Sequence, residues 1–364
     1  MASAQHSLRD HDWPLLVLTL VICSMGVLQI YSATHDTIWR DAWWKQIIWI
    51  TLGLVLFFVI SRMDYHRFVS HAYWLWGLSV IGLVFVFLIG ARVYGSRRWI
   101  PLGGGFRFQI SEFVKIVIIL VVTRFLTDLK KDELDWRNLL KLGVLVGVPT
   151  VLVMKQPDLG TSLTYIPVLL TGVYLYGLRW HYWVVLLLSA ALALPIGWHF
   201  LKDYQKARLI TFLDPTQDPQ GNGYQVIQSK IAVGAGGMWG KGVTRGTQTQ
   251  LQFLPVPHTD FIFSAFAEEH GFVGVVVVLG LYLLLLMQLV QNAQTAADST
   301  GMYLCMGVCA LLLFHVLVNV GMVVGRMPVT GIPLPLMSAG GSNILMMFIA
   351  LGLVNSVRLQ RYMN

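Results

Sequence analysis

The chain has 364 residues, of which 56% are hydrophobic and 12% are charged. Soluble domains carry about 25% charged residues, so this composition excludes a soluble globular protein and indicates an integral membrane protein. The formal net charge is +8. Because no soluble domain separates the apolar segments, this basic excess favours an anionic lipid or a phosphorylated lipid substrate over nucleic acid.

Ten apolar segments are candidates for membrane-spanning helices. A spanning helix needs roughly 20 mainly apolar residues, because the hydrocarbon core of a bilayer is about 30 Å thick. The ten predicted spans are 14–33, 43–61, 73–91, 110–127, 139–154, 161–178, 182–200, 261–289, 302–324 and 343–357. The first one lacks a small-residue cleavage site and is interpreted as a span rather than a signal peptide. The sequence therefore predicts an all-α polytopic membrane protein, with 1–364 as a single domain.

Glu112 and Lys115 stand three residues apart near the start of the fourth predicted span. Charged groups inside a span cost about 2.5–3.5 kcal/mol each on insertion scales, so they need a partner or a purpose. One interpretation is a structural ion pair that lets the helix insert, since this spacing places both side chains on one helix face. The other is a cavity in which Lys115 meets a phosphate.

Asp158 precedes the sixth predicted span, in the short turn Gln156-Pro157-Asp158-Leu159-Gly160. An Asp in this position can cap the helix that follows, with Pro157 fixing its entry. It can also belong to a site, because the predicted topology places it on the same face as three long polar connections. These are 92–111, 201–260 and 325–342.

The longest connection, 201–260, holds eight glycines, six Lys or Arg and four Asp. Its start, around Arg208, alternates basic and apolar residues as an amphipathic interfacial helix does. Its middle is glycine-rich, which would let backbone N–H groups approach an oxyanion. It matches neither a Walker loop nor a dinucleotide fingerprint.

The loop ends at His258-Thr259-Asp260, directly before the eighth predicted span. A carboxylate at the mouth of the membrane can act as a general base or hold a divalent cation. Alternatively, Asp260 caps the following helix. Glu268 and Glu269 lie further along this span, and because they are adjacent, at most one of them is expected to join a site.

Several of these segments together resemble the SEDS (shape, elongation, division and sporulation) family. The segments are Arg107–Lys115, Gln156–Gly160, Gln228–Ala232, His258–Phe263 and Gly331–Pro335. The resemblance covers essentially the whole chain with the same ten-span layout. It is strongest to the cell-elongation members, through the short N-terminus, the segment 246–250 and Thr259.

This resemblance implies a peptidoglycan glycosyltransferase of cell elongation that polymerises lipid II into a nascent glycan strand and releases undecaprenyl pyrophosphate. It implies a class B penicillin-binding protein as partner, and no nucleic acid. It also implies the cytoplasmic (inner) membrane as location, with cytoplasmic termini and the active site on the extracytoplasmic face.

The resemblance assigns the catalytic role to Asp260, which would deprotonate the acceptor sugar or hold a divalent cation, Mg²⁺ or Mn²⁺. The residues expected to bind substrate are Arg107, Glu112, Lys115, Asp158, Arg208, Lys230 and His258, and Glu268 and Glu269 are candidates for acidic support.

Two other functions stay open at the level of the sequence. The ten-span layout and the central Glu112/Lys115 pair are also compatible with a lipid II flippase. A flippase should carry polar groups on both faces, whereas the long polar connections crowd one face. A non-catalytic scaffold is the third interpretation, and it predicts that Asp260→Ala retains function in cells.

Overall fold

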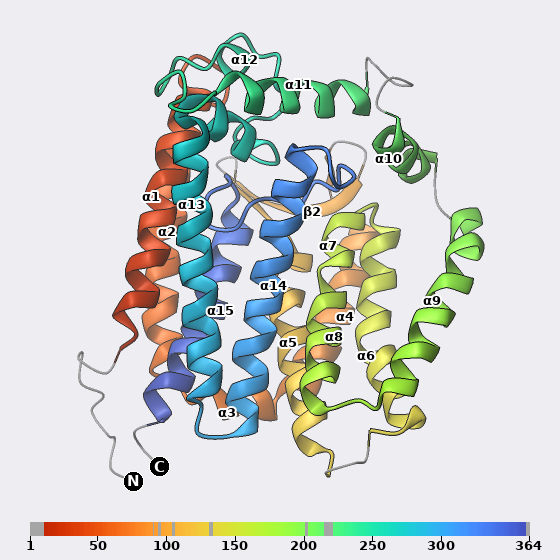
Figure 1. The fold of residues 1–364 in the computed structure, drawn as a ribbon. Coiled ribbons are helices and arrows are strands. Elements are labelled where there is room, and N and C mark those ends of the chain that lie inside the picture. Colours follow the sequence, from red (N-terminus) through yellow and green to blue (C-terminus); the bar gives the residue numbers. More distant parts are fainter. Residues whose placement is uncertain are drawn as a thin grey trace.

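The computed structural model describes residues 11–89, 91–93, 96–103, 106–130, 134–200, 203–214 and 221–361. Within them, long helices run side by side in one bundle (Figure 1). The long helices are α1 (Trp13–Thr34), α2 (Ala42–Ser61), α4 (Ala72–Ile89), α5 (Ile110–Asp128), α6 (Trp136–Lys155), α8 (Tyr165–Tyr176), α9 (Trp180–Phe200), α13 (Ile262–Gln294), α14 (Ser299–Val323) and α15 (Gly341–Gln360). The shorter ones are α3 (Tyr65–Ser70), α7 (Leu159–Leu163), α10 (Asp203–Leu213), α11 (Asn222–Ala235) and α12 (Thr247–Gln250).

Seven helical segments of the described chain are long and apolar enough to cross a membrane: α1, α2, α6, α7 with α8, α13, α14 and α15. Helices α4, α5 and α9 occupy the other three predicted spans. The described apolar parts of α4 and α9 are shorter, and α5 carries four charged residues. The polytopic α-helical architecture is thus confirmed.

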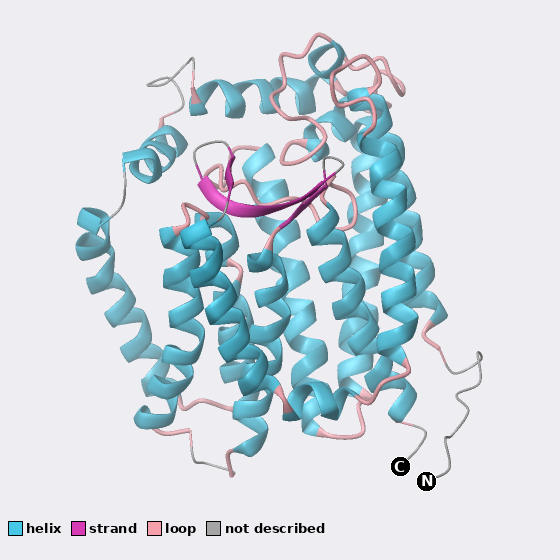
Figure 2. Cartoon of the chain, turned by 180° about the vertical axis from the view of Figure 1, so that it is seen from behind, coloured by secondary structure: helices cyan, strands magenta, loops and turns pink. Residues whose placement is uncertain are grey.

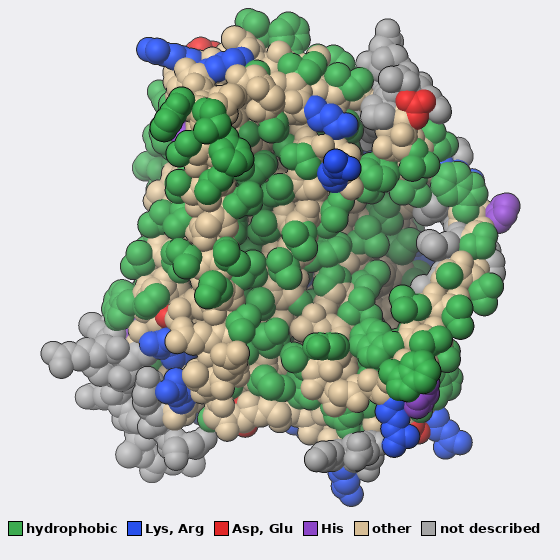
Figure 3. Space-filling model, viewed as in Figure 1, with side chains coloured by type: hydrophobic (Ala, Val, Ile, Leu, Met, Phe, Trp, Pro, Cys, Tyr) green, Lys and Arg blue, Asp and Glu red, His purple; other side chains and the backbone are tan. Residues whose placement is uncertain are grey.

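The bundle has two polar ends, and the short helices α10, α11 and α12 lie at only one of them (Figure 1). We call the end where α1 begins and α15 ends the terminal end, and the opposite end, where α10, α11 and α12 lie, the loop end (Figure 1). In Figure 3 hydrophobic side chains cover the middle of the molecule, while Lys and Arg side chains gather toward the two ends. This distribution is the one that a bilayer imposes.

The segment 92–111 contains a small sheet, which the all-α prediction did not include. Strands β1 (Ala91–Val93), β2 (Ser96–Gly103) and β3 (Phe106–Phe108) pair in the order β1-β2-β3, all antiparallel. Pro101 pairs with Arg107, and both pairings contain a register shift. Figure 2 shows the sheet lying across the loop end, between the bundle and α11.

Helices α14 and α15 form the centre of the bundle. In the apolar window of α15, 89% of the residues are buried, against 28% for α2 and 22% for α13. Close approach to α15 depends on small residues: a Cβ added to Gly53 of α2 would lie 2.5 Å from the Phe348 ring. Small residues allow such packing between membrane helices. Candidate site residues are therefore sought at the loop end of α14 and α15 and in the segments that cover these helices there.

Candidate active site

Asp260 lies at the loop end, two residues before α13, with its side chain partly buried. The N-cap of α13 is Phe261, and no side chain caps this helix. The interpretation of Asp260 as the helix cap is therefore wrong. The carboxylate faces the loop 325–342, because a Cβ added to Gly331 would lie 3.5 Å from Asp260 Oδ2.

Burial and the neighbouring charges together set the pKa of Asp260. Burial raises the pKa of Asp260 above its ordinary value, the positive charges of Arg98 and Arg208 act in the opposite direction, and the Asp158 carboxylate raises it again. A carboxylate with a raised pKa is a stronger base than an exposed one. The two guanidinium groups keep a negative charge tolerable at this place.

Asp158 turns out to be both a helix cap and part of this cluster. Its Oδ1 accepts the Thr161 N–H at 3.2 Å and lies 3.2 Å from Arg98 Nη1. Its Oδ2 accepts a hydrogen bond of 2.8 Å from Gln109 Nε2. Asp158 thereby joins the start of α7 to β2 and to the entry of α5.

Arg208 of α10 connects the long loop to the same place. Its Nη1 donates to the carbonyl oxygen of Thr330 at 3.3 Å. A Cβ added to Gly160 would lie 2.5 Å from that same oxygen. Glycine is therefore required at the start of α7, where α7, α10 and the loop 325–342 meet around Asp260.

Asn319 fixes the backbone of Asp260. Its Nδ2 donates to the Asp260 carbonyl oxygen at 2.9 Å and to the Ile332 carbonyl oxygen at 2.8 Å, and the side chain is fully buried. Next to it, Ser338 Oγ donates to the Thr259 carbonyl oxygen at 2.7 Å. These bonds tie the end of the 201–260 loop to α14 and to the loop 325–342.

Glu112 and Lys115 form the predicted ion pair, but in a separate cluster. Lys115 Nζ lies 2.9 Å from each carboxylate oxygen of Glu112 and 3.0 Å from His315 Nε2. Asn343 Nδ2 donates to Glu112 at 2.9 Å, and His315 Nδ1 lies 2.8 Å from the Leu311 carbonyl oxygen. All three ammonium protons of Lys115 thus have protein acceptors. This satisfied, buried group fits the structural interpretation better than phosphate binding.

The other expected substrate-binding residues differ in position. His258 is buried with its ring 5.5 Å from that of Trp39, and burial lowers the pKa of His258 to about 4, so this ring is neutral at pH 7. Lys230 is exposed on α11, and its stem packs over Gly325, where an added Cβ would lie 1.9 Å from Lys230 Cε. Arg107 lies in β3, and its side chain is outside the described part of the structure.

Glu268 binds the end of the loop 201–260, and Glu269 binds α1. Glu268 accepts hydrogen bonds from Lys241 Nζ at 2.8 Å and from the backbone of α12 at Gln248 and Thr249. Glu269 accepts from Ser32 Oγ at 2.5 Å and from Gln29 Nε2 of α1 at 3.2 Å. The described hydrogen bonds and ion pairs join neither of them to Asp260.

The glycine-rich stretch 234–242 serves a break in α13, which corrects its interpretation as an anion cradle. At Gly271 the backbone leaves the helix, with φ 64° and ψ −165°. Phe272 N and Val273 N donate to the carbonyls of Gly237 and Met238, at 2.8 and 3.1 Å. The freed carbonyls accept instead from the inserted stretch, where Lys241 N donates to Glu268 at 3.1 Å and Gly242 N to Glu269 at 2.9 Å.

This exchange requires glycine because the two backbones touch. A Cβ added to Gly236 would lie 2.1 Å from the Ala267 carbonyl oxygen, and one added to Gly240 would lie 2.1 Å from that of Glu269. Gly240 also has φ +77°, a conformation that L side chains rarely adopt. The exchange gives partners to the N–H groups of Phe272 and Val273 and to the carbonyls of Glu268 and Glu269, as the backbone of a membrane helix requires.

The side chains at Asp260 do not by themselves form a resident metal site. Within the described residues, no three His, Cys, Asp or Glu side chains are grouped as metal ligands. The neighbours that act on Asp260 are mainly guanidinium groups, which repel a cation. A divalent cation here would need oxygens of the substrate to complete its coordination shell, so the metal stays a prediction.

Three residues of this site were not selected from the sequence: Arg98, Gln109 and Asn319. Arg98 was visible only as one of several basic residues in 92–111, because the strand that positions it was not predicted. Asn319 did carry a signal, since it stands with His315 at i,i+4 within an apolar span. Polar residues in a span need partners, and this pattern predicts a polar stripe on one face of α14.

Comparison with known proteins gives one family. The family model for cell cycle proteins of the FtsW, RodA and SpoVE type matches residues 13–363. The chain is 41% identical over 354 residues to the peptidoglycan glycosyltransferase MrdB of Escherichia coli K12, covering 97% of this chain and 94% of that protein. It is 34% identical to the peptidoglycan glycosyltransferase RodA of Treponema pallidum, covering 96% and 97%.

Solved structures agree with this result. A chain from a peptidoglycan synthase complex that coordinates polymerization and crosslinking superposes with a TM-score of 0.83 at 36% identity, covering 97% of this chain and 99% of that one. The rod shape determining protein RodA of Thermus thermophilus gives a TM-score of 0.72 at 30% identity, covering 97% and 98%. By sequence and by fold, this chain belongs to the FtsW/RodA/SpoVE family, the SEDS proteins.

Proposed function

We propose that this protein is the peptidoglycan glycosyltransferase of cell elongation, that it polymerises lipid II, and that Asp260 is its catalytic base. The observation that carries the assignment is the environment of Asp260: a partly buried carboxylate that faces the loop 325–342 and is acted on by the positive charges of Arg98 and Arg208. Two buried donors of the same cluster, Arg98 Nε and Thr330 Oγ1, have no hydrogen-bond partner among the described residues. Unsatisfied buried donors are costly, and the oxygens of a diphosphate would satisfy them.

The proposed reaction follows from these groups. Asp260 takes the proton from the 4-hydroxyl of the acceptor sugar of lipid II, and that oxygen forms a bond to the anomeric carbon of the growing strand. The bond from this carbon to the diphosphate breaks with inversion, and its electron pair leaves on undecaprenyl pyrophosphate. In this proposal the diphosphate lies beside Arg98 and Arg208, whose charges then stabilise the transition state more than the ground state, because the leaving group gains negative charge.

The proposed orientation places the loop end on the extracytoplasmic side of the cytoplasmic membrane and both termini in the cytoplasm. Asp260, Asp158 and Arg208 would then face the compartment in which the glycan strand is built. We further propose a class B penicillin-binding protein as partner, since a structural neighbour of this chain comes from a peptidoglycan synthase complex.

The test uses purified Asp260→Asn protein with lipid II and a class B penicillin-binding protein, and it measures glycan chains on gels. Asp36→Asn is the matched control, because Asp36 is a loop-end carboxylate whose side chain is 82% exposed. We expect chains from the wild type and from Asp36→Asn, and loss of about 10²-fold or more in Asp260→Asn. Chain formation by Asp260→Asn at the wild-type rate refutes the assignment.

The same protein in proteoliposomes separates polymerisation from transport. Fluorescent lipid II that crosses the bilayer without forming polymer would favour the flippase. Polymer formation that depends on Asp260 favours the transferase.

A further inference from the structure

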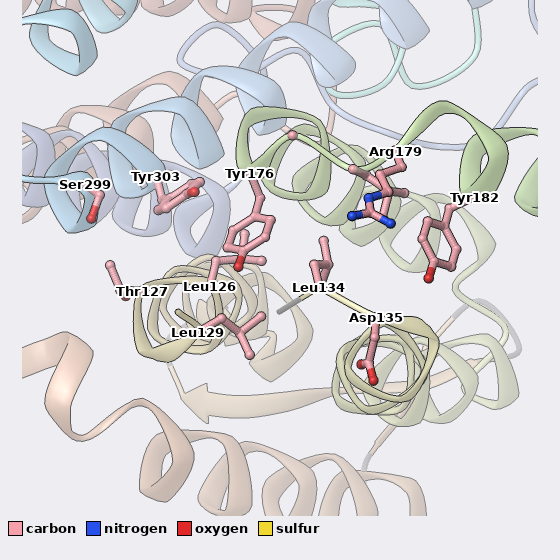
Figure 4. A pocket seen from close by; sticks show the side chains of 12 residues that line it. Leu126, Thr127, Leu129, Leu134, Asp135, Tyr176, Arg179, Tyr182, Ser299 and Tyr303 are labelled. Carbon is pink, nitrogen blue, oxygen red and sulfur yellow. The ribbon is translucent and has the colours of Figure 1, made fainter. Parts of the chain in front are cut away.

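A cavity lies at the terminal end of the bundle, opposite the loop end at which Asp260 lies (Figure 1). Its volume is about 360 Å³. It is formed where α5 and α8 end and where α6, α9 and α14 begin, and its walls include Leu126, Tyr176, Arg179, Tyr182 and Tyr303 (Figure 4). None of these residues takes part in the proposed reaction.

The cavity stands at the level of a membrane interface. Trp136 at the start of α6, Trp180 at the start of α9 and Tyr174 near the end of α8 are exposed beside it. Exposed Trp and Tyr at the ends of spanning helices mark the headgroup region of a bilayer. A molecule entering this cavity therefore comes from a depth at which lipid headgroups reside.

The walls favour an anion. In Figure 4 Arg179 stands between Tyr176 and Tyr182, with Leu134 below. Within the described chain, no carboxylate lies within ion-pair distance of Arg179. In addition, α6, α9 and α14 begin at the cavity, and the N-terminus of a helix carries a partial positive charge. Among the described lining residues, the one acidic side chain is Asp135, which accepts the Asn138 N–H at 2.9 Å and so serves as the cap of α6.

The rest of the wall matches a lipid rather than a small soluble anion. The Tyr176 hydroxyl donates to the carbonyl oxygen of Lys130, which closes one side. Tyr182 and Tyr303 each carry a hydroxyl donor on a half-buried ring. Leu126, Leu129 and Leu134 give the cavity an apolar floor. Aromatic rings with polar tips over aliphatic side chains suit a headgroup joined to an apolar chain.

We propose that this cavity binds the phosphodiester headgroup of an anionic phospholipid from the leaflet at the terminal end. Arg179 supplies the charge, the hydroxyls of Tyr182 and Tyr303 supply neutral donors, and the leucine floor takes the first carbons of an acyl chain. Binding there would hold the ends of α5 and α8 against the starts of α9 and α14. This inference does not depend on the reaction at Asp260.

The experiment measures the thermal unfolding of the full chain in a neutral detergent with three additives: dioctanoyl phosphatidylglycerol, dioctanoyl phosphatidylcholine and inorganic phosphate. A ligand that binds only the folded state raises Tm, by about 2 °C at roughly ten times its Kd for a chain of this size. We expect this shift with phosphatidylglycerol alone. An equal shift with phosphatidylcholine or with inorganic phosphate overturns the proposal.

Two variants and one control locate the effect. Arg179→Gln and Tyr303→Phe should each reduce the phosphatidylglycerol shift at least threefold, and Tyr303→Phe keeps the shape of the wall if Arg179→Gln folds poorly. Arg62→Gln is the control, because Arg62 is exposed at the terminal end and does not line the cavity. Unchanged shifts in both variants, or equal losses in the control, contradict the assignment.

Discussion

Asn319→Leu tests whether the position of Asp260 is fixed from α14. The substitution keeps the volume of the side chain but removes the Nδ2 group that bonds the carbonyls of Asp260 and Ile332 at 2.9 and 2.8 Å. A buried carbonyl left without a donor costs about 1–3 kcal/mol, so the pair costs about 2–6 kcal/mol. The Asp260 backbone can lower this cost by moving until its carbonyl oxygen finds another donor, and that movement would displace the carboxylate. Misplacement of a reacting group by about 1 Å lowers a rate about 10²-fold.

The assay is the initial rate of lipid II consumption per folded protein, with kcat and KM determined separately. Asn355→Leu is the matched control: Asn355 is equally buried and makes two side-chain hydrogen bonds, to Asp12 N and His11 Nδ1, at the terminal end. Both variants should lower Tm, but only Asn319→Leu should lower kcat by about 10²-fold. An equal fall in kcat in both variants, or a normal kcat in folded Asn319→Leu, refutes the positioning role.

Three further predictions concern charge at the loop end. Arg98→Gln removes a positive charge that lowers the pKa of Asp260, so the acid limb of the kcat/KM profile should move to higher pH; an unmoved or acid-shifted limb contradicts the role of Asp260 as base. His258→Gln should leave activity between pH 6 and 8 unchanged, because the pKa of His258 is already lowered to about 4; since the unfolded chain binds this proton below pH 6.5, the wild type should lose stability as pH falls from 6.5 to 4, and the variant should lose less. If a divalent cation binds between Asp260 and the diphosphate of lipid II, chelation should lower activity, and added Mg²⁺ or Mn²⁺ should restore it. Full activity in excess chelator would contradict a role for a metal in the reaction.

The spans could be predicted because one physical quantity, the thickness of the hydrocarbon layer, fixes the length of an apolar helix. Asp260 could be selected as a candidate site residue because a carboxylate directly before a membrane span is energetically costly unless it has a partner or a function. The sheet of β1 to β3 could not, since three short strands with two register shifts leave no periodic pattern. Without β2, the partnership of Arg98 with Asp158 was also invisible.

The glycines of 234–242 show a different limit of the sequence. Clustered glycines indicate that backbone must approach something closely, but they do not say what approaches. Here the partner is the broken backbone of α13 at Gly271, which lies about thirty residues further along the chain. The Glu268 side chain binds Lys241 of the same stretch, whereas the Glu269 side chain binds Ser32 of α1, which is why two adjacent carboxylates can both be buried without sharing a site.

The geometry of the site depends on which face of α14 points toward α5 and Asp260. His315 and Asn319 are four residues apart and so lie on one face of this helix. His315 contacts Lys115 of α5 at 3.0 Å, and Asn319 bonds the backbone of Asp260 at 2.9 Å. Lipid offers neither side chain a hydrogen-bond partner, so any rotation of α14 that breaks one contact exposes a polar group to hydrocarbon. The buried ion pair and the Asp260 backbone are therefore held by the same helix face, although the two side-chain clusters are separate.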